Sequence, residues 1–202
     1  MLEALRRQLS ESLFEKVAGP EREKHARRIH GAAGPRMFAD DRPIRHVHAD
    51  HAMFIGGLRA LLLQSLHPLA MAAVAQHSDY RTDPWGRLQR TSLFVGVTTY
   101  GTEKDALKAV ERLGRVHQHI HGTASDGRAY RADDPHLLGW VHVAEVDSFL
   151  QCHRKYGEKP LDDYDEYVAD MAVIADAMGI PDPPRTVAEL DSKLNSYRAE
   201  LK

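Results

Sequence analysis

The sequence has few of the residues that would hold a fold together covalently or bind a nucleic acid. Cys152 is the only cysteine among the 202 residues, which excludes an internal disulfide and any metal site built on cysteine pairs. Lysine and arginine number 27 against 29 aspartate and glutamate residues, so the chain has no basic excess. We therefore expect no nucleic-acid partner.

Long hydrophobic runs are also missing. The longest apolar stretch, residues 52–75, is interrupted by Arg59, Gln64 and the His67-Pro68 pair. Because an arginine is costly in hydrocarbon, this stretch predicts buried core helices and no transmembrane segment. Leucines alternate with charged residues at the N-terminus, which is unlike a secretory signal. The expected location is the cytoplasm.

No segment alternates apolar and polar residues beside a hairpin turn, so the predicted class is all-α. At 43% hydrophobic and 28% charged residues, the composition is typical of one folded domain over residues 1–202. We expect about seven or eight helices in a globin-like or bundle-like packing. Within the domain, residues 1–20 form an N-terminal helix, residues 21–44 a connector with little helix, and residues 45–202 the main body.

Several helix starts are marked by capping residues. Asp83 and Asp134 each precede a proline, and Thr102 with Asp105 forms a capping-box-like pair. The expected helices of the main body cover residues 46–66, 69–76, 84–94, 102–122, 135–157, 163–178 and 186–202. The last helix has an apolar face, so we expect either that it folds back on the body or that further helices follow it.

The chain is rich in histidine, with 13 residues, and three of them stand close together. His117, His119 and His121 would all align on a strand, whereas on a helix only His117 and His121 share a face. Neither a His-Glu-x-x-His motif nor a pair of Glu-x-x-His motifs is present, which argues against a zinc or di-iron enzyme. Two alternatives remain here: one histidine binds a haem iron, or all three are helix-surface residues.

The other histidines have more ordinary interpretations. His48 and His51 are three residues apart, a spacing compatible with a metal, but a solvated helix start with His46 is the preferred interpretation. His67 and His142 stand in apolar surroundings, where a histidine is typically a hydrogen-bonded core residue.

A group of polar residues follows Pro84. Arg87, Arg90 and Thr91 would share one helix face. Such clustered cations suit an anionic group such as a propionate, or a polar pocket, and the alternative is a charged surface.

The order of short motifs is more informative than any one of them. The motifs are Gly57 to Gln64, His67-Pro68, His77-Ser78, Asp83-Pro84, Arg87-Leu88-x-x-Thr91, Tyr100-Gly101, Val116-His117-x-x-Ile120-x-Gly122, Tyr130-x-Ala132-x-Asp134-Pro135 and Leu138-x-Trp140-Val141-His142. Over about residues 45 to 190, this set resembles the haem-dependent oxygenase family that includes rubber oxygenase (latex clearing protein) and the oxygenase MpaB.

The resemblance implies an all-α fold around one haem b, with His117 as the ligand of the iron. It implies catalytic roles for Arg87, Arg90 and Thr91, with Arg87 also in contact with the cofactor. Rubber oxygenase has a lysine where Arg90 stands, and an arginine keeps the charge but does not release its proton. His142, and also His67, would lie near the haem pocket.

The implied partners are dioxygen and an apolar, isoprenoid or alkene-containing small molecule. Polyisoprene itself is not expected, because the chain lacks an export signal and stops before the C-terminal helices that family members usually add. The alternatives are a non-catalytic haem-binding protein or sensor, and a zinc or di-iron helical enzyme. The substrate, the redox partner and the oligomeric state are not indicated.

Overall fold

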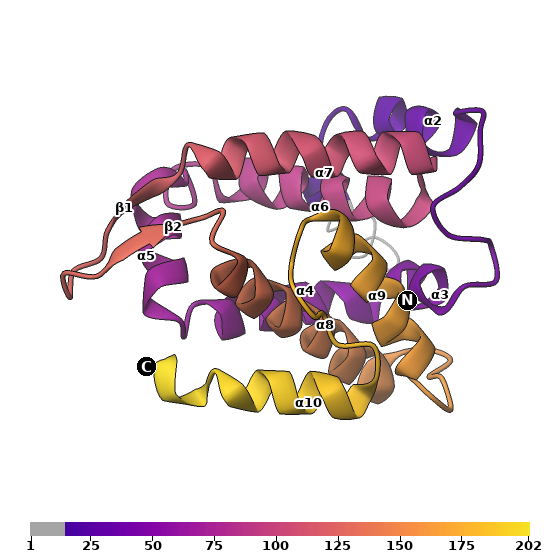
Figure 1. Ribbon diagram of the computed structural model, residues 1–202. Helices are drawn as coiled ribbons and strands as arrows, with labels where there is room; N and C mark the ends of the chain where they lie inside the picture. Colours follow the sequence, from indigo (N-terminus) through magenta and orange to yellow (C-terminus); the bar gives the residue numbers. More distant parts are fainter. Residues whose placement is uncertain (1–14) are drawn as a thin grey trace, which may run out of the picture. The chain divides into compact units, whose positions relative to one another are not determined.

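The computed structural model describes residues 15–202, and this part of the chain is mostly helical (Figure 1). The elements follow the order α2 (Arg22–Gly31), α3 (Pro43–Ala49), α4 (Ala52–Gln64), α5 (Pro68–His77), α6 (Pro84–Tyr100), α7 (Glu103–Gln118), β1 (His121–Thr123), β2 (Ala129–Arg131), α8 (Pro135–Tyr156), α9 (Asp165–Ala177), α10 (Val187–Ser196) and the 3-10 helix η1 (Arg198–Glu200). The predicted all-α class is confirmed.

The chain divides into two compact units, which are described separately below. Among the described residues, unit 1 comprises residues 15–37 and Ser78–Ala109, and unit 2 comprises Phe38–His77 and Val110–Lys202. The expectation from the sequence that residues 1–202 form one domain stays a prediction.

Polar contacts organise unit 1. The Arg36 guanidinium donates hydrogen bonds to the carbonyls of Ile29, His30 and Ala32 at the end of α2, and to that of Tyr100 at the end of α6. It therefore satisfies carbonyls that a helix end leaves without an internal partner. The prediction of a connector with little helix over residues 21–44 is wrong, because α2 occupies ten of these residues. This helix buries no side chain, so it has no apolar period to reveal it.

The predicted caps of unit 1 are confirmed. Asp83 accepts a hydrogen bond from the Gly86 N–H at the start of α6. Thr102 Oγ1 accepts one from the Asp105 N–H and donates one to the Asp105 carboxylate. The N-terminal helix predicted over residues 1–20 lies largely outside the described residues, although residues 15–18 are helical and end at Gly19, with φ of 78°.

Unit 2 is built around α8, a helix of 22 residues that Asp134 caps as predicted. Helix α4 packs along it so closely that a Cβ at Gly56 would lie 2.8 Å from the Phe149 ring. The Arg59 side chain lies 2.6 Å from Asp147 and donates to the Ser148 hydroxyl, which joins the two helices by a second, polar contact. Thus the arginine within the apolar stretch is paired.

The single helix predicted over residues 46–66 is wrong, because α3 ends at Ala49 and α4 begins at Ala52. Asp50 has extended dihedral angles, and its carboxylate accepts hydrogen bonds from the N–H groups of Ala52 and Glu158. A side chain that caps the next helix in this way competes with continuing the first one.

The helix predicted over residues 102–122 is also shorter than expected, because it ends at Gln118 and the chain enters β1. Strand β1 pairs antiparallel with β2, with Gly122 opposite Tyr130. The Ala132 N–H donates to the Ile120 carbonyl at 2.9 Å, so this segment bonds across the hairpin instead of along a helix.

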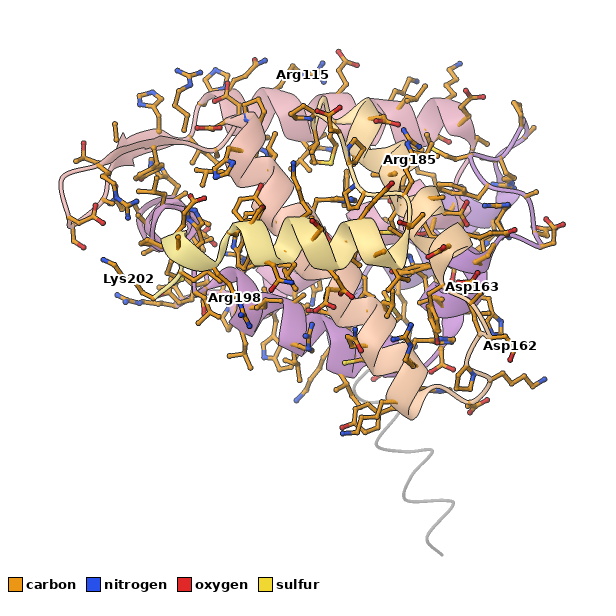
Figure 2. All side chains as sticks on the ribbon, turned by 60° about the horizontal axis from the view of Figure 1, so that its bottom comes forward. Arg115, Asp162, Asp163, Arg185, Arg198 and Lys202 are labelled. Carbon is orange, nitrogen blue, oxygen red and sulfur yellow. The ribbon has the colours of Figure 1, made fainter. Side chains whose placement is uncertain are left out.

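The C-terminal helices complete unit 2. Thr186 caps α10 through the Glu189 N–H, and the buried Leu190 and Tyr197 place this helix against α8 and α9. The helix therefore folds back on the body, which was one of the two expectations. Figure 2 shows charged side chains around the outside of the helices, with Arg115 pointing outward from α7.

Within residues 15–202, no one helix has both the length and the apolar character needed to cross a membrane. Helices α4 and α5 meet these criteria only as a pair, and they are bent by 105° at the break between them.

Candidate functional site

His117 lies in the last turn of α7 and is half-buried. Burial lowers the pKa of its imidazole, and the nearby negative charge of Asp133 only partly opposes this shift. Among residues 15–202, no side chain or backbone group is hydrogen-bonded to the His117 ring. A neutral imidazole with a free lone pair is the form that binds a metal or a haem iron.

The two neighbouring histidines differ from His117. The His119 ring is exposed, and its Nδ1 lies 2.7 Å from the Arg115 carbonyl of the same helix, to which it donates. His121 is exposed in β1. Because α7 ends at Gln118, the predicted sharing of one helix face by His117 and His121 is wrong, and so is the alignment of all three on a strand. Only His117 has the burial expected of a cofactor ligand.

The predicted cationic group lies on one turn of α6, in unit 1. Arg87 is half-buried and donates to the Ser78 hydroxyl at 2.7 Å, and burial together with the charge of Arg90 lowers its pKa. Arg90 is exposed, 3.7 Å from the Asp83 carboxylate. The exposed Thr91 donates its hydroxyl hydrogen to the Arg87 carbonyl. Their predicted roles at a cofactor stay predictions.

His142 is buried in α8, and its Nε2 has no hydrogen-bond partner among the described residues. The interpretation of His142 as a fully hydrogen-bonded core residue is therefore wrong. Burial lowers its pKa to about 4, although the charge of Asp176 raises it. A buried polar atom without a partner costs about 1–3 kcal/mol, so this nitrogen is a candidate for contact with a bound group.

His67, by contrast, is a satisfied core histidine. It is fully buried, and its Nε2 lies 3.2 Å from the Glu200 carboxylate. Glu200 also lies within hydrogen-bond distance of His136 at the start of α8. His136 and Glu200 have no signal in the sequence, because Glu200 is 133 positions from His67 and no local motif links them.

The histidines around α3 also depart from the prediction. Since α3 ends at Ala49, His48 and His51 do not share a helix face. His48 Nε2 lies 3.2 Å from the Tyr167 hydroxyl, and burial, followed by the charge of His153, lowers the His48 pKa to about 3. A solvated helix start therefore describes the exposed His46 and His51 but not His48.

Glu145 is a further candidate residue without a signal in the sequence. It stands three positions after His142 in α8, hence on the same side of the helix. Burial raises its pKa to about 7. Its charge also contributes to holding the pKa of Tyr167 well above the usual value, after the larger effect of burial. A single glutamate in an apolar helix belongs to no sequence motif, so its raised pKa becomes evident only from the packing around it.

In a comparison with protein families, the family described as "ER-bound oxygenase mpaB/B'/Rubber oxygenase, catalytic domain" matches residues 45–202. No curated protein and no solved structure matches the chain significantly.

Proposed function

Because the chain belongs to the family of the mpaB and rubber oxygenase catalytic domains, we propose that it is a haem b-dependent oxygenase. The family supports an oxygenase with dioxygen and a substrate as its partners. The proposed substrate is an apolar, isoprenoid or alkene-containing small molecule. The observation that carries the haem assignment is the half-buried imidazole of His117, which stands without a partner at the position of the family's histidine motif.

In unit 2, the chemistry of His117 fits a haem iron. The group needs an imidazole for its iron, cations for its propionates and apolar contacts for its ring. His117, in unit 2, supplies a neutral imidazole with a free lone pair. For Arg87, a half-buried guanidinium of unit 1, contact with the cofactor stays a prediction of the resemblance. The buried Nε2 of His142 is an unpartnered polar atom that such a group would approach.

When bound, the haem supplies the oxidation chemistry of its iron with dioxygen. The residues of the chain would bind and orient. His117 would hold the iron through a ring nitrogen, and the negative charge of Asp133 nearby would make that nitrogen more basic. Arg87 and Arg90 would attract and orient anionic or polarised oxygen atoms, but they would not accept a proton, because a guanidinium stays charged.

Glu145, on the same side of α8 as His142, would be able to hold a proton. With a pKa of about 7, its carboxyl group is partly protonated at neutral pH, which suits a group that gives or takes a proton in the reaction. Thr91 would orient rather than transfer protons, because its hydroxyl hydrogen is donated to the Arg87 carbonyl while its lone pairs stay available. A cytoplasmic location stays a prediction of the sequence.

The test is an absorption spectrum of the full chain expressed with a haem precursor, compared with His117→Ala and with His119→Ala as the matched control. We expect a Soret band in the parent and in His119→Ala, and its loss or displacement in His117→Ala. Added imidazole should restore it, because the truncated side chain leaves room for a free ligand.

An unchanged Soret band in His117→Ala would contradict the ligand assignment, and its loss in His142→Ala instead would transfer the role to that residue. No Soret band in any variant would overturn the haem proposal, and a stoichiometric non-haem metal in its place would favour the zinc or di-iron alternative. Oxygen uptake with isoprenoid alkenes then separates an oxygenase from a haem carrier or sensor, which would show the band without consuming oxygen.

A further inference from the structure

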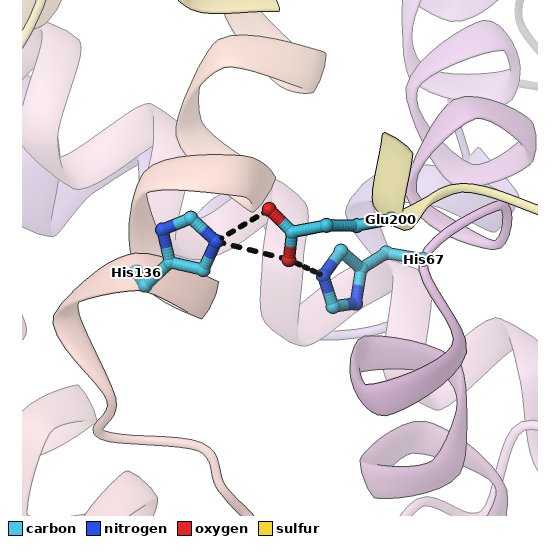
Figure 3. Close-up of side chains that lie close together, drawn as sticks. All are labelled: His67, His136 and Glu200. Atoms are coloured by element: carbon cyan, nitrogen blue, oxygen red, sulfur yellow. Dashed lines mark hydrogen bonds and ion pairs between the residues drawn. The ribbon is translucent and has the colours of Figure 1, made fainter. Parts of the chain in front are cut away.

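Three side chains that the proposed oxygenase chemistry does not use meet in unit 2 (Figure 3). His67 lies at the corner between α4 and α5, His136 in the first turn of α8, and Glu200 in η1. His136 Nε2 lies 2.9 and 3.0 Å from the two Glu200 carboxylate oxygens, and His67 Nε2 lies 3.2 Å from one of them. We call these residues the His67–His136–Glu200 cluster.

We propose that this cluster is a binding site for a divalent transition metal, with Zn²⁺ as the ion that its donor atoms fit best. Two imidazole nitrogens and one carboxylate are a common ligand set for zinc. The ligand atoms lie within 4.8 Å of one another. Zinc ligands stand about 2.0–2.1 Å from the metal, hence about 3.3 Å from each other in a tetrahedron. The distances between the carboxylate and the two imidazoles would need to lengthen by only a few tenths of an ångström.

The side chains around the cluster hold it in place. The His136 ring packs against Tyr197 with centroids 4.7 Å apart and the rings tilted by 34°, and the Tyr197 hydroxyl donates to the His136 carbonyl. Trp140 also packs against Tyr197, and both of these residues are buried. The Lys202 N–H donates to the Leu66 carbonyl, which keeps the C-terminal residues beside His67. The ligands therefore lose little further freedom when they bind a metal.

The charges of the cluster suit a cation. Burial opposes ionisation of Glu200, but hydrogen bonds with His136 and His67 outweigh it and lower the Glu200 pKa. The nearby Arg128 is paired with Asp126 at 2.7 Å, which offsets its repulsion of a metal. Metal binding to His67 Nε2 would place the ring proton on Nδ1 and end the 3.4 Å hydrogen bond from the Ala70 N–H. That bond is long, so little is lost.

The site would have an open position. The His136 side chain is 55% exposed and that of Glu200 34%, whereas His67 is enclosed. Water can therefore reach the metal from one side and complete a four-coordinate site. The metal would join the C-terminal segment to the starts of α5 and α8, and this role is independent of the haem.

The test uses the full-length protein, stripped with a chelator and dialysed against Zn²⁺ or Mg²⁺. We expect retention of one zinc ion per chain by elemental analysis, no retained magnesium, and a Tm that rises by about 5 °C with excess zinc. His136→Asn and Glu200→Gln should lose stoichiometric zinc and the Tm rise. His51→Asn is the matched control, because it removes an exposed histidine of the same unit.

Circular dichroism of the zinc-free variants checks that they fold. We expect them to fold, because both substitutions lie at partly exposed positions. A protein that retains no zinc would overturn the proposal, and so would variants that bind zinc as the parent does. The result is separable from the haem proposal, because His117→Ala should leave zinc uptake unchanged and His136→Asn should leave the Soret band unchanged.

Discussion

The two units of this protein are stabilised by different interactions. Unit 2 holds a continuous apolar core around α8, with fully buried side chains such as Leu150, Val146 and Tyr167. Among the described residues of unit 1, Ala106 is the only buried hydrophobic side chain. There the helix ends depend on directed hydrogen bonds from Arg36 and Thr102. Burial scales with area, whereas hydrogen bonds depend on geometry, so the two units should respond to different substitutions.

The largest effect is expected in the core of unit 2. Leu150 in α8 has no exposed surface, so Leu150→Ala removes buried methyl groups and leaves a cavity. The free energy of unfolding should fall by about 3 kcal/mol in urea denaturation. Leu62→Ala is the matched control, because Leu62 is 71% exposed and its loss should change stability by less than about 0.5 kcal/mol. Equal effects of the two substitutions would contradict the described core.

The next effect depends on pH. The folded-state pKa of Glu145 is about 7, above the model-compound value of 4.5, so the folded chain binds the proton more tightly than the unfolded one. Its contribution to stability is therefore lost as pH rises from about 4.5 through 7. Glu145→Gln should be more stable than the parent by about 2 kcal/mol at pH 8 and nearly equal to it at pH 5. A difference that does not change with pH would contradict the raised pKa of Glu145.

The stability of the parent must be compared with that of Glu145→Gln at the same pH, because two histidines also change the stability within this pH range. The pKa of His48 is lowered to about 3 and that of His142 to about 4. Both stay neutral in the folded chain, so they reduce stability as pH falls below about 6.5. Comparing the parent with Glu145→Gln at each pH cancels their contribution.

The smallest effect should be confined to unit 1. Arg36→Met removes the donor of four hydrogen bonds to helix-end carbonyls. Local opening of the end of α2 should become easier by about 1.5 kcal/mol, seen as faster amide hydrogen exchange in α2. Arg36→Lys keeps the charge but has fewer donors, so its exchange rate in α2 should lie between those of the parent and Arg36→Met. Exchange in α8 should not change, and an equal loss of protection in α8 would contradict a local effect at the end of α2.

The elements that the sequence predicted correctly share one property. Asp83, Asp134 and Thr186 cap N–H groups only two or three residues ahead, so both partners lie within one window of the sequence. The family motif containing His117 is likewise local. Such signals involve only residues that are already neighbours in the sequence, so they can be recognised before the fold is known.

The features that the sequence did not predict depend on distant partners. Asp50 interrupts a helix while it also binds the Glu158 N–H, and Glu200 reaches His67 from the other end of the main body. Glu145 has a raised pKa only because other helices enclose it. Likewise, α2 carries no apolar period, and Arg36 reaches its last carbonyls from beyond the helix.

The break between α3 and α4 has a consequence for the order of folding. One carboxylate, that of Asp50, begins α4 and also receives an N–H from a residue 108 positions later. Closing a loop of that length is slow compared with forming a helical turn. Early in folding, the Asp50 carboxylate should therefore hold only the Ala52 N–H, so the break competes with a continuous helix over residues 43–64. The Glu158 N–H is added only when the end of α8 arrives, which makes the final fixing of the break a late event set by chain topology.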